Sequence, residues 1–370
     1  MNKYSAVLIL ILASVAMFFA GCPGKSGERA GDDGVLKIVN LINGTLGDKS
    51  FFDSSAAGMD LIKAKYGSEV LTKTIEMSYD QTTWEPTLLD VADQGWDIII
   101  VGTGQMTEML QEVAADNPDT RFIIYDTEVD YSLGLENVYS ILYSQNEASF
   151  VAGVLAATLT NSGLPLTNPE KLIGFLGGMD IAVINDFLVG YVEGARYVDP
   201  DTKVAVSYIG SFEDTAKGKE MALAQYNQGV DIGFNVAGQA GLGQLDAAKD
   251  MNRYAIGVDS DQAEFIAPKD RATAELIATS VLKHVDKSLL RAIDMHMEGT
   301  APYGSSEVLG FAEEGVGIAK NEFYMAIVPE EIRAVLDDVE AKILSGEIEV
   351  GSAYGMDTEA INTLRYSISP

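Results

Sequence analysis

Short apolar runs alternate with segments of helical periodicity along most of the chain. The first run, Val35–Ile42, is rich in β-branched residues and is followed by a polar loop and a helix-period segment, Ser54–Tyr66. This order predicts a strand, a loop and a helix, the opening unit of a parallel α/β sheet. Because the order recurs, we expect a doubly wound α/β fold with further strands at 70–77, 96–101, 121–125, 137–143, 171–176, 203–209, 231–236 and 254–258.

The two halves of the chain resemble each other. Gln94–Ile98 followed by Gly104-Gln105 matches Gln228–Ile232 followed by Gly238-Gln239, with six identities at an offset of 134 positions. The match predicts two copies of one domain, with equivalent loops facing each other across a cleft. Beyond residue 258 we expect a strand at 275–280, a helix at 283–297, short strands at 308–315 and 316–319, and a final helix at 329–345. Such a chain crosses between its domains more than once, which creates a hinge.

Equivalent residues form facing pairs at the predicted cleft. Asp126 and Asp259 each end an apolar strand, and Phe51 and Phe187 each precede a glycine by seven positions. Two facing aromatic rings would clamp a planar group, because stacking in a dry slot adds to the burial of apolar area.

The loop Asp48–Asp53 carries two adjacent phenylalanines in the region where parallel α/β sheets bind ligands, outside the carboxyl ends of the strands. Loops of this kind seldom contain large apolar side chains. Two interpretations stay open for Phe51 and for Phe52. The ring packs beneath the following helix as a staple, or it forms a wall for a flat ligand.

Residues 1–21 have the pattern of a lipoprotein signal peptide. Lys3 precedes an apolar run, Ala6–Ala20, which is too short to span a bilayer, and Cys22 is the one cysteine of the chain. We expect Cys22 to be lipidated and 22–34 to be a flexible tether, with the protein held on a membrane of the cell envelope and facing the periplasm or the exterior. The alternative is a cleaved signal with a chance cysteine.

The charge excludes one class of partner. The formal net charge is -30, and removal of residues 1–21, which contain only Lys3 as a charged residue, makes it -31. A surface this acidic repels nucleic acid.

The length of the folded part indicates two domains.

Sequence patterns of catalysis are absent. The chain has no nucleophile elbow and no phosphate-binding loop of the Walker type. His284 and His296 are twelve positions apart on one predicted helix, about 18 Å along its axis, which is too far to share a metal ion. Gly238–Gly243 does not follow a first strand, so we expect no dinucleotide there. We therefore expect no enzyme, no cofactor and no metal site.

Four motifs resemble, in the same order, those of the basic membrane protein family of bacterial lipoproteins: Asp48–Phe51, Gly177–Ile181 with Phe187, Gly210–Lys219 and Ile256–Gln262. The resemblance extends from about Leu36 to beyond Gly315. It implies a type I periplasmic-binding-protein fold of two Rossmann-like lobes joined by a multi-strand hinge. It also implies a substrate-binding protein of an ABC transporter, in a family that includes purine nucleoside receptors.

The resemblance implies a set of ligand-binding residues: Asp48, Phe51, Phe52, Asp126, Phe187, Gly238, Asp259 and Lys283. The phenylalanines at 51 and 187 would stack on the base, Asp126 would read its edge, and Asp259 with Lys283 would hold the ribose. Lys283 is expected to begin a helix, where the helix dipole disfavours a cation, so Asp259 is its candidate partner. The chain departs from the family at Phe52, where Asn is usual, and this removes an amide contact with the base.

The implied lobes are 35–146 with 263–304, and 147–262 with 305–370.

The predicted function is a lipid-anchored receptor that delivers a nucleoside such as adenosine, guanosine or inosine to an ABC transporter permease. The alternative is a surface lipoprotein that acts as an interaction protein or adhesin and keeps only a vestigial cleft.

Overall fold

The computed structural model describes residues 34–370. The predicted signal peptide, Cys22 and the tether up to residue 33 lie outside the described residues. In the described part of the chain, every helix is too short or too polar to cross a bilayer.

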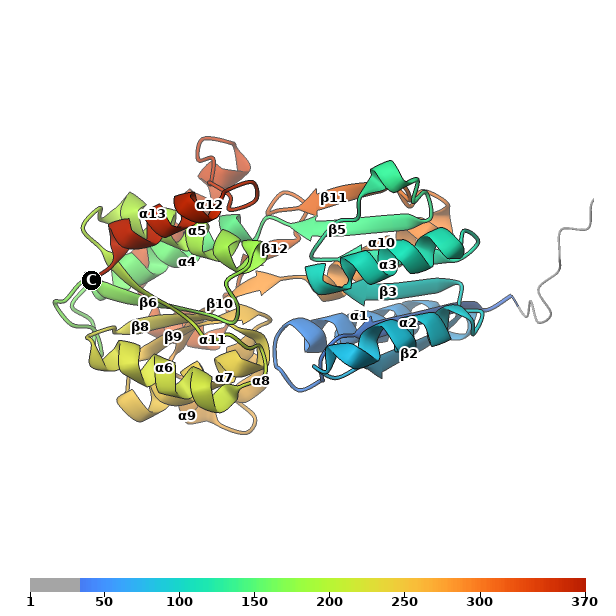
Figure 1. The fold of residues 1–370 in the computed structure, drawn as a ribbon. Helices are drawn as coiled ribbons and strands as arrows, with labels where there is room; N and C mark the ends of the chain where they lie inside the picture. The colour runs from blue at the N-terminus through green and yellow to red at the C-terminus, as the bar shows by residue number, and fades with distance from the viewer. Residues whose placement is uncertain (1–33) are drawn as a thin grey trace, which may run out of the picture. The chain divides into compact units, whose positions relative to one another are not determined.

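Two sheets of mainly parallel strands account for the architecture of residues 34–370 (Figure 1). The first has the order β11-β5-β4-β3-β1-β2 and the second the order β12-β10-β9-β8-β6-β7, so the two orders are equivalent. The first sheet contains β1 (Leu36–Ile42), β2 (Val70–Glu76), β3 (Ile98–Gly102), β4 (Arg121–Tyr125), β5 (Val138–Tyr143) and β11 (Ser305–Leu309). The second contains β6 (Leu172–Gly177), β7 (Lys203–Tyr208), β8 (Ile232–Val236), β9 (Tyr254–Asp259), β10 (Ile277–Lys283) and β12 (Val316–Ile318).

Helices cover both faces of each sheet. We define the first lobe as the first sheet with α1 (Phe51–Tyr66), α2 (Trp84–Ala92), α3 (Thr107–Asp116) and α10 (Val285–Glu298). The second lobe is the second sheet with α4 (Gln145–Thr160), α5 (Ala182–Val198), α6 (Thr215–Asn227), α7 (Gly238–Met251), α8 (Gln262–Ile266), α9 (Arg271–Ala274), α11 (Glu322–Ile327), α12 (Glu330–Leu344) and α13 (Thr358–Ile368). Single 3₁₀ turns lie at Gly67–Glu69, Gln81–Thr83, Gly104–Met106 and Tyr131–Leu133.

Neighbouring residues of a central strand face opposite helical layers. In β3, Ile98 packs in the core with α1 and α10, whereas Ile99 packs with α2 and α3. In β6, Phe175 packs in the core with α4 and α5, whereas Leu176 packs with α6 and α7. Burial on both faces explains why these strands appear in the sequence as continuous apolar runs.

The internal repeat is confirmed by its helix contacts as well as by the strand order. A Cβ atom on Gly58 in α1 would lie 3.1 Å from the Asp286 backbone in α10. A Cβ atom on Gly194 in α5 would lie 1.9 Å from the Phe150 carbonyl oxygen in α4. The glycine that follows each candidate clamp phenylalanine by seven positions thus allows the same close contact between helices in each lobe.

Within residues 34–370 the chain passes between the lobes three times, after β5, after β10 and after β11. Backbone hydrogen bonds join these crossings: Ser144 N–H donates to the Leu309 carbonyl (3.0 Å) and His284 N–H to the Gly315 carbonyl (2.9 Å). The predicted multi-strand hinge is therefore confirmed.

Two strands lie in the opposite lobe from the one predicted. β10, expected in the first lobe as part of 263–304, pairs in parallel with β9 of the second sheet. β11, expected in the second lobe as part of 305–370, pairs in parallel with β5 of the first sheet. The hydrogen bonds between strands decide to which lobe each strand belongs. The sequence does not mark the positions at which the chain crosses from one lobe to the other.

Element limits also differ near the C-terminus. Lys283 is the last residue of β10 and not the start of a helix, so the predicted conflict with a helix dipole does not arise. The helix predicted at 329–345 is not the final one, because α13 (Thr358–Ile368), which was not predicted, follows it.

Candidate functional site

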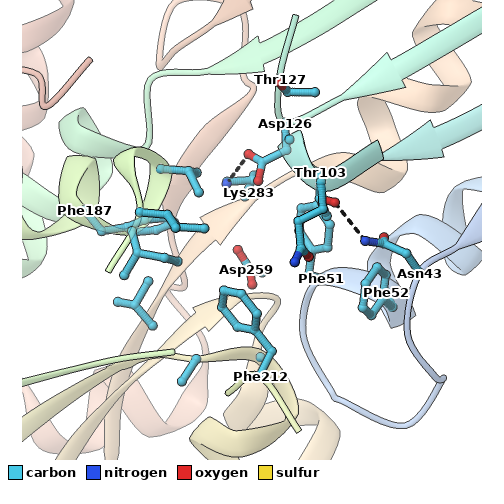
Figure 2. A pocket seen from close by; sticks show the side chains of 18 of the residues that line it. Asn43, Phe51, Phe52, Thr103, Asp126, Thr127, Phe187, Phe212, Asp259 and Lys283 are labelled. Carbon is cyan, nitrogen blue, oxygen red and sulfur yellow. Dashed lines mark hydrogen bonds and ion pairs between the residues drawn. The ribbon is translucent and has the colours of Figure 1, made fainter. Parts of the chain in front are cut away.

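A cavity of about 370 Å³ lies at the carboxyl ends of the strands of both sheets (Figure 2). All eight residues of the predicted ligand-binding set line it: Asp48, Phe51, Phe52, Asp126, Phe187, Gly238, Asp259 and Lys283. The structure thus brings together residues that are up to 235 positions apart, from Asp48 to Lys283. Their contact with a ligand stays a prediction.

Lys283 and Asp126 form a buried ion pair inside the cavity. Nζ of Lys283 donates to Oδ1 of Asp126 over 2.5 Å, and the side chains are 2% and 9% exposed. Burial raises the pKa of the Asp126 carboxyl, and the Lys283 ammonium opposes this shift. Asp126 has a left-handed φ of 69° at the end of β4, which turns the carboxylate out of the strand direction.

Phe51 and Phe187 lie on opposite sides of Lys283 in Figure 2. Nζ of Lys283 lies 5.6 Å from the centroid of the Phe51 ring and 4.9 Å from that of the Phe187 ring. The cation therefore approaches both ring faces, which stabilises its burial. The two rings come from α1 of the first lobe and α5 of the second, and both line the cavity. That they clamp a planar group stays a prediction.

Asp259 joins the lobes. Its Oδ2 accepts a hydrogen bond from the Ser50 hydroxyl (2.6 Å), and the Ser260 hydroxyl donates to the Ser50 carbonyl (2.9 Å). Asp259 has a φ of 61°, close to that of Asp126, so the two strand-end aspartates are structurally equivalent. Burial raises the pKa of the Asp259 carboxyl, and the nearby Lys283 charge opposes this.

Asp48 lines the cavity, but its carboxylate is used within its own loop. Oδ1 accepts from the backbone N–H groups of Ser50 (3.0 Å) and Asp53 (3.1 Å), and Oδ2 from that of Phe52 (2.9 Å). Burial nevertheless raises the pKa of Asp48 from 3.8 to about 6. The residue therefore caps α1 and holds the loop in place, and this role accounts for three of its hydrogen bonds.

Phe52 packs mainly beneath its own loop. It is 7% exposed, and a Cβ atom on Gly44 would lie 2.2 Å from its ring. Its ring contacts Phe51 and Tyr79 edge-on, at centroid distances of 5.4 and 6.3 Å. The staple interpretation thus describes Phe52 better than Phe51, although both rings reach the cavity wall.

Gly238 begins α7 and has a φ of 53°. A side chain there would be strained, and the next turn is fixed by the hydrogen bond from Ala240 N–H to the Phe212 carbonyl (2.9 Å). Glycine therefore lets the first turn of this helix approach the cavity.

Several cavity-lining residues were not predicted. Asn43 and Thr103 follow β1 and β3, and the Asn43 amide donates to the Thr103 hydroxyl over 2.9 Å. The rule that strand ends meet at the ligand edge, applied to every strand, would have found them. Tyr354 also lines the cavity, and no sequence signal marks it.

The described residues contain no candidate metal centre. Among residues 34–370 no group of three or more histidine, cysteine, aspartate or glutamate side chains is arranged to hold a metal ion. The predicted separation of the two histidines is consistent with their contacts: His284 precedes α10, and Nδ1 of His296 lies 3.0 Å from the Tyr303 hydroxyl.

Similar proteins share both the sequence and the fold. The chain is 31% identical to the ABC transporter nucleoside-binding protein BmpA of Lactococcus lactis, with 95% of this chain and 99% of that protein covered. It is 30% identical to Basic membrane protein A of Borreliella burgdorferi, with coverage of 95% and 96%. A crystal structure of an ABC transporter solute-binding protein from Aeropyrum pernix K1 superposes with a TM-score of 0.78 at 25% identity, covering 90% of this chain and 98% of that one. Because the family model described as ABC transporter substrate-binding protein, PnrA-like, matches residues 35–353, the chain belongs to this family of transporter substrate-binding proteins.

Proposed function

We propose that this protein captures a nucleoside, with purine nucleosides preferred, between its lobes and delivers it to an ABC transporter permease. One observation carries the proposal: two phenylalanine rings from different lobes approach a single buried cation that is paired with a strand-end aspartate. The rings provide stacking surfaces for a base, and the polar groups between them provide partners for a sugar. The name of the Lactococcus lactis relative points to the same ligand class.

The charge of the cavity favours an uncharged ligand. Three carboxyl groups, those of Asp48, Asp126 and Asp259, line it together with one ammonium, that of Lys283. A phosphate would meet repulsion from these carboxylates. We therefore expect nucleosides and not nucleotides to bind.

The cavity also weighs against the alternative role as an interaction protein with a vestigial cleft. In a vestigial cleft, side chains would fill the space between the lobes, whereas here a volume of about 370 Å³ stays open. That volume lies in the range of sites that enclose small molecules.

Native mass spectrometry of the freshly purified chain tests the ligand class, because a closed clamp retains its ligand. Calorimetry should then show binding of adenosine, inosine or guanosine, and much weaker binding of ribose alone, the free base and adenosine 5′-monophosphate. If the protein binds none of the nucleosides, or binds the monophosphate more tightly, the proposed ligand class is wrong.

The proposal includes a lipid anchor at Cys22 that holds the receptor on a membrane of the cell envelope. The Cys22→Ala variant should appear in the soluble fraction, because the acyl chains contribute about 0.8 kcal/mol per buried methylene. Fractionation with detergent partitioning measures this. Continued recovery of the variant in the membrane fraction would exclude the anchor and leave the ligand proposal untouched.

A further inference from the structure

Tyr354 lines the cavity from a part of the chain that contributes no other residue to it. It lies in residues 345–357, which we call the C-terminal strap and which connect α12 to α13. The match to the family model ends at residue 353, so Tyr354 is the first residue beyond it. Tyr354 thus adds to the cavity wall from just outside the matched residues.

A buried carboxylate holds the strap directly before this tyrosine. Oδ1 of Asp186 accepts from the Ser352 hydroxyl (2.6 Å) and from the Ala353 backbone N–H (2.8 Å). Its Oδ2 accepts from the Gln145 amide (2.6 Å), and Asp186 and Gln145 are 1% and 0% exposed. Asp186 immediately precedes Phe187, so one turn of α5 supplies both a candidate stacking ring and the anchor of the strap.

A second pair of contacts fixes the strap one residue earlier. Oε2 of Glu193 accepts from the Gly351 N–H (2.8 Å), and the Asn146 amide donates to the Gly351 carbonyl (2.9 Å). A Cβ atom on Gly351 would lie 2.4 Å from the Glu193 carboxylate, so a side chain there would displace this carboxylate from its present position. The backbone leading to Tyr354 is therefore held by α4 and α5 together.

The helix after the strap holds the neighbouring part of the wall. Arg365 of α13 donates to both carboxylate oxygens of Asp180, at 2.9 and 2.5 Å, and to Oδ1 of Asn185 (2.9 Å). The cavity-lining residues 181–184 lie between these two partners. The C-terminal segment thus shapes two adjacent parts of the cavity.

Tyr354 is 43% exposed as a residue, although hydrogen bonds hold the backbone directly before it. Desolvation of the phenol and the negative charges of Asp126 and Asp186 raise its pKa, so the hydroxyl stays protonated and can donate a hydrogen bond. The Tyr354 ring is partly uncovered at the cavity. A ligand that covers it would bury additional apolar area, which favours binding.

We propose that Tyr354 is a specificity-determining residue that contacts the polar edge of the bound nucleobase, and that Asp186 positions it. This inference rests on the proposed function. The hydroxyl would discriminate between bases that carry a donor and bases that carry an acceptor at that edge, and the ring would cover the base.

Calorimetry of the full chain with adenosine and inosine tests this, because these nucleosides differ only in the polar edge of the base. Tyr354→Phe removes the hydroxyl alone, so the ratio of the two Kd values should change roughly three- to tenfold. Tyr354→Ala should also weaken the binding of both nucleosides. Tyr366→Ala is the matched control, since that tyrosine of α13 is 80% exposed and does not line the cavity, and it should change neither value.

The outcomes separate the two proposals. Circular dichroism first checks that both Tyr354 variants are folded. If the wild type binds nucleosides, and if both folded variants keep the wild-type Kd values and their ratio, the role of Tyr354 is refuted and the proposed function stands. If wild type binds no nucleoside, the proposed function fails and this inference fails with it. Loss of discrimination in Tyr354→Phe, with stability unchanged, supports the assignment.

Discussion

Nζ of Lys283 lies 2.5 Å from Oδ1 of Asp126, and this ion pair connects the end of β10 in the second lobe to the end of β4 in the first. The sequence predicted Asp259 as the partner of Lys283. In the structure Lys283 instead donates directly to Asp126, and Asp259 accepts a hydrogen bond from the Ser50 hydroxyl. Each aspartate therefore links the two lobes through a different partner. All three side chains line the cavity between the lobes.

Replacement of Lys283 should destabilise the protein strongly. Lys283→Met leaves Asp126 buried without its counter-ion, and the loss of one member of a buried pair costs about 3 to 5 kcal/mol. Urea denaturation measures the free energy of unfolding. Lys171→Met is the control, because the Lys171–Asp199 pair has a similar distance of 2.7 Å but a lysine that is 47% exposed, and its loss should cost no more than about 1 kcal/mol. Equal losses in the two variants would contradict the importance of the buried pair.

Truncation of Phe187 should weaken ligand binding. Phe187→Ala removes one stacking surface of the proposed clamp and should cost about 2 to 4 kcal/mol of nucleoside binding measured by calorimetry. Phe52→Ala provides the comparison, since Phe52 packs beneath its own loop. That variant should lose about 3 to 5 kcal/mol of stability and much less of its affinity. Unchanged affinity in Phe187→Ala would eliminate the clamp.

The ribose should be read through Asp259. Its strand-end carboxylate can accept hydrogen bonds from sugar hydroxyls, and an unpaired polar group in a buried site costs about 1 to 3 kcal/mol. Ribonucleosides should therefore bind at least about tenfold more tightly than 2′-deoxyribonucleosides, and Asp259→Ala should remove most of this preference.

The control for this experiment is Ser50→Ala. It removes the hydroxyl that now donates to Asp259 and keeps the carboxylate, so the preference for ribose should persist. Equal Kd values of the wild type for adenosine and 2′-deoxyadenosine would show that the sugar is not read in this way.

Asp48 should make stability depend on pH. Its pKa is raised from 3.8 to about 6 in the folded state, so the native protein binds this proton more tightly than the unfolded chain does. The Asp48 carboxyl therefore stabilises the folded state most below pH 3.8. Its contribution to the free energy of unfolding falls as the pH rises from about 4 to about 6. The stability of wild type relative to Asp48→Asn should decrease over that window, as measured by urea denaturation at several pH values. A difference that does not vary with pH would contradict the raised pKa.

The sequence alone determined the doubly wound fold, the internal repeat and several of the residues that line the cleft. These features depend on local patterns: apolar runs of the β type, helical periods, and an aspartate or a phenylalanine at an equivalent place in each half. Phe51, Phe187, Asp126 and Asp259 could be found in this way because the repeat assigns each of them a partner, and strand ends in such sheets meet at the ligand edge.

Only the tertiary structure decided which carboxylate pairs with Lys283, which lobe holds β10 and β11, and that Tyr354 lines the cavity. Each of these depends on contacts between residues far apart in the chain. Asp126 is 157 positions from Lys283, and Asp186 is 166 positions from Ser352. Local propensity carries no information about such distances, because the path of the chain through the hinge and along the strap is set by buried hydrogen bonds and ion pairs that form only when the lobes are folded.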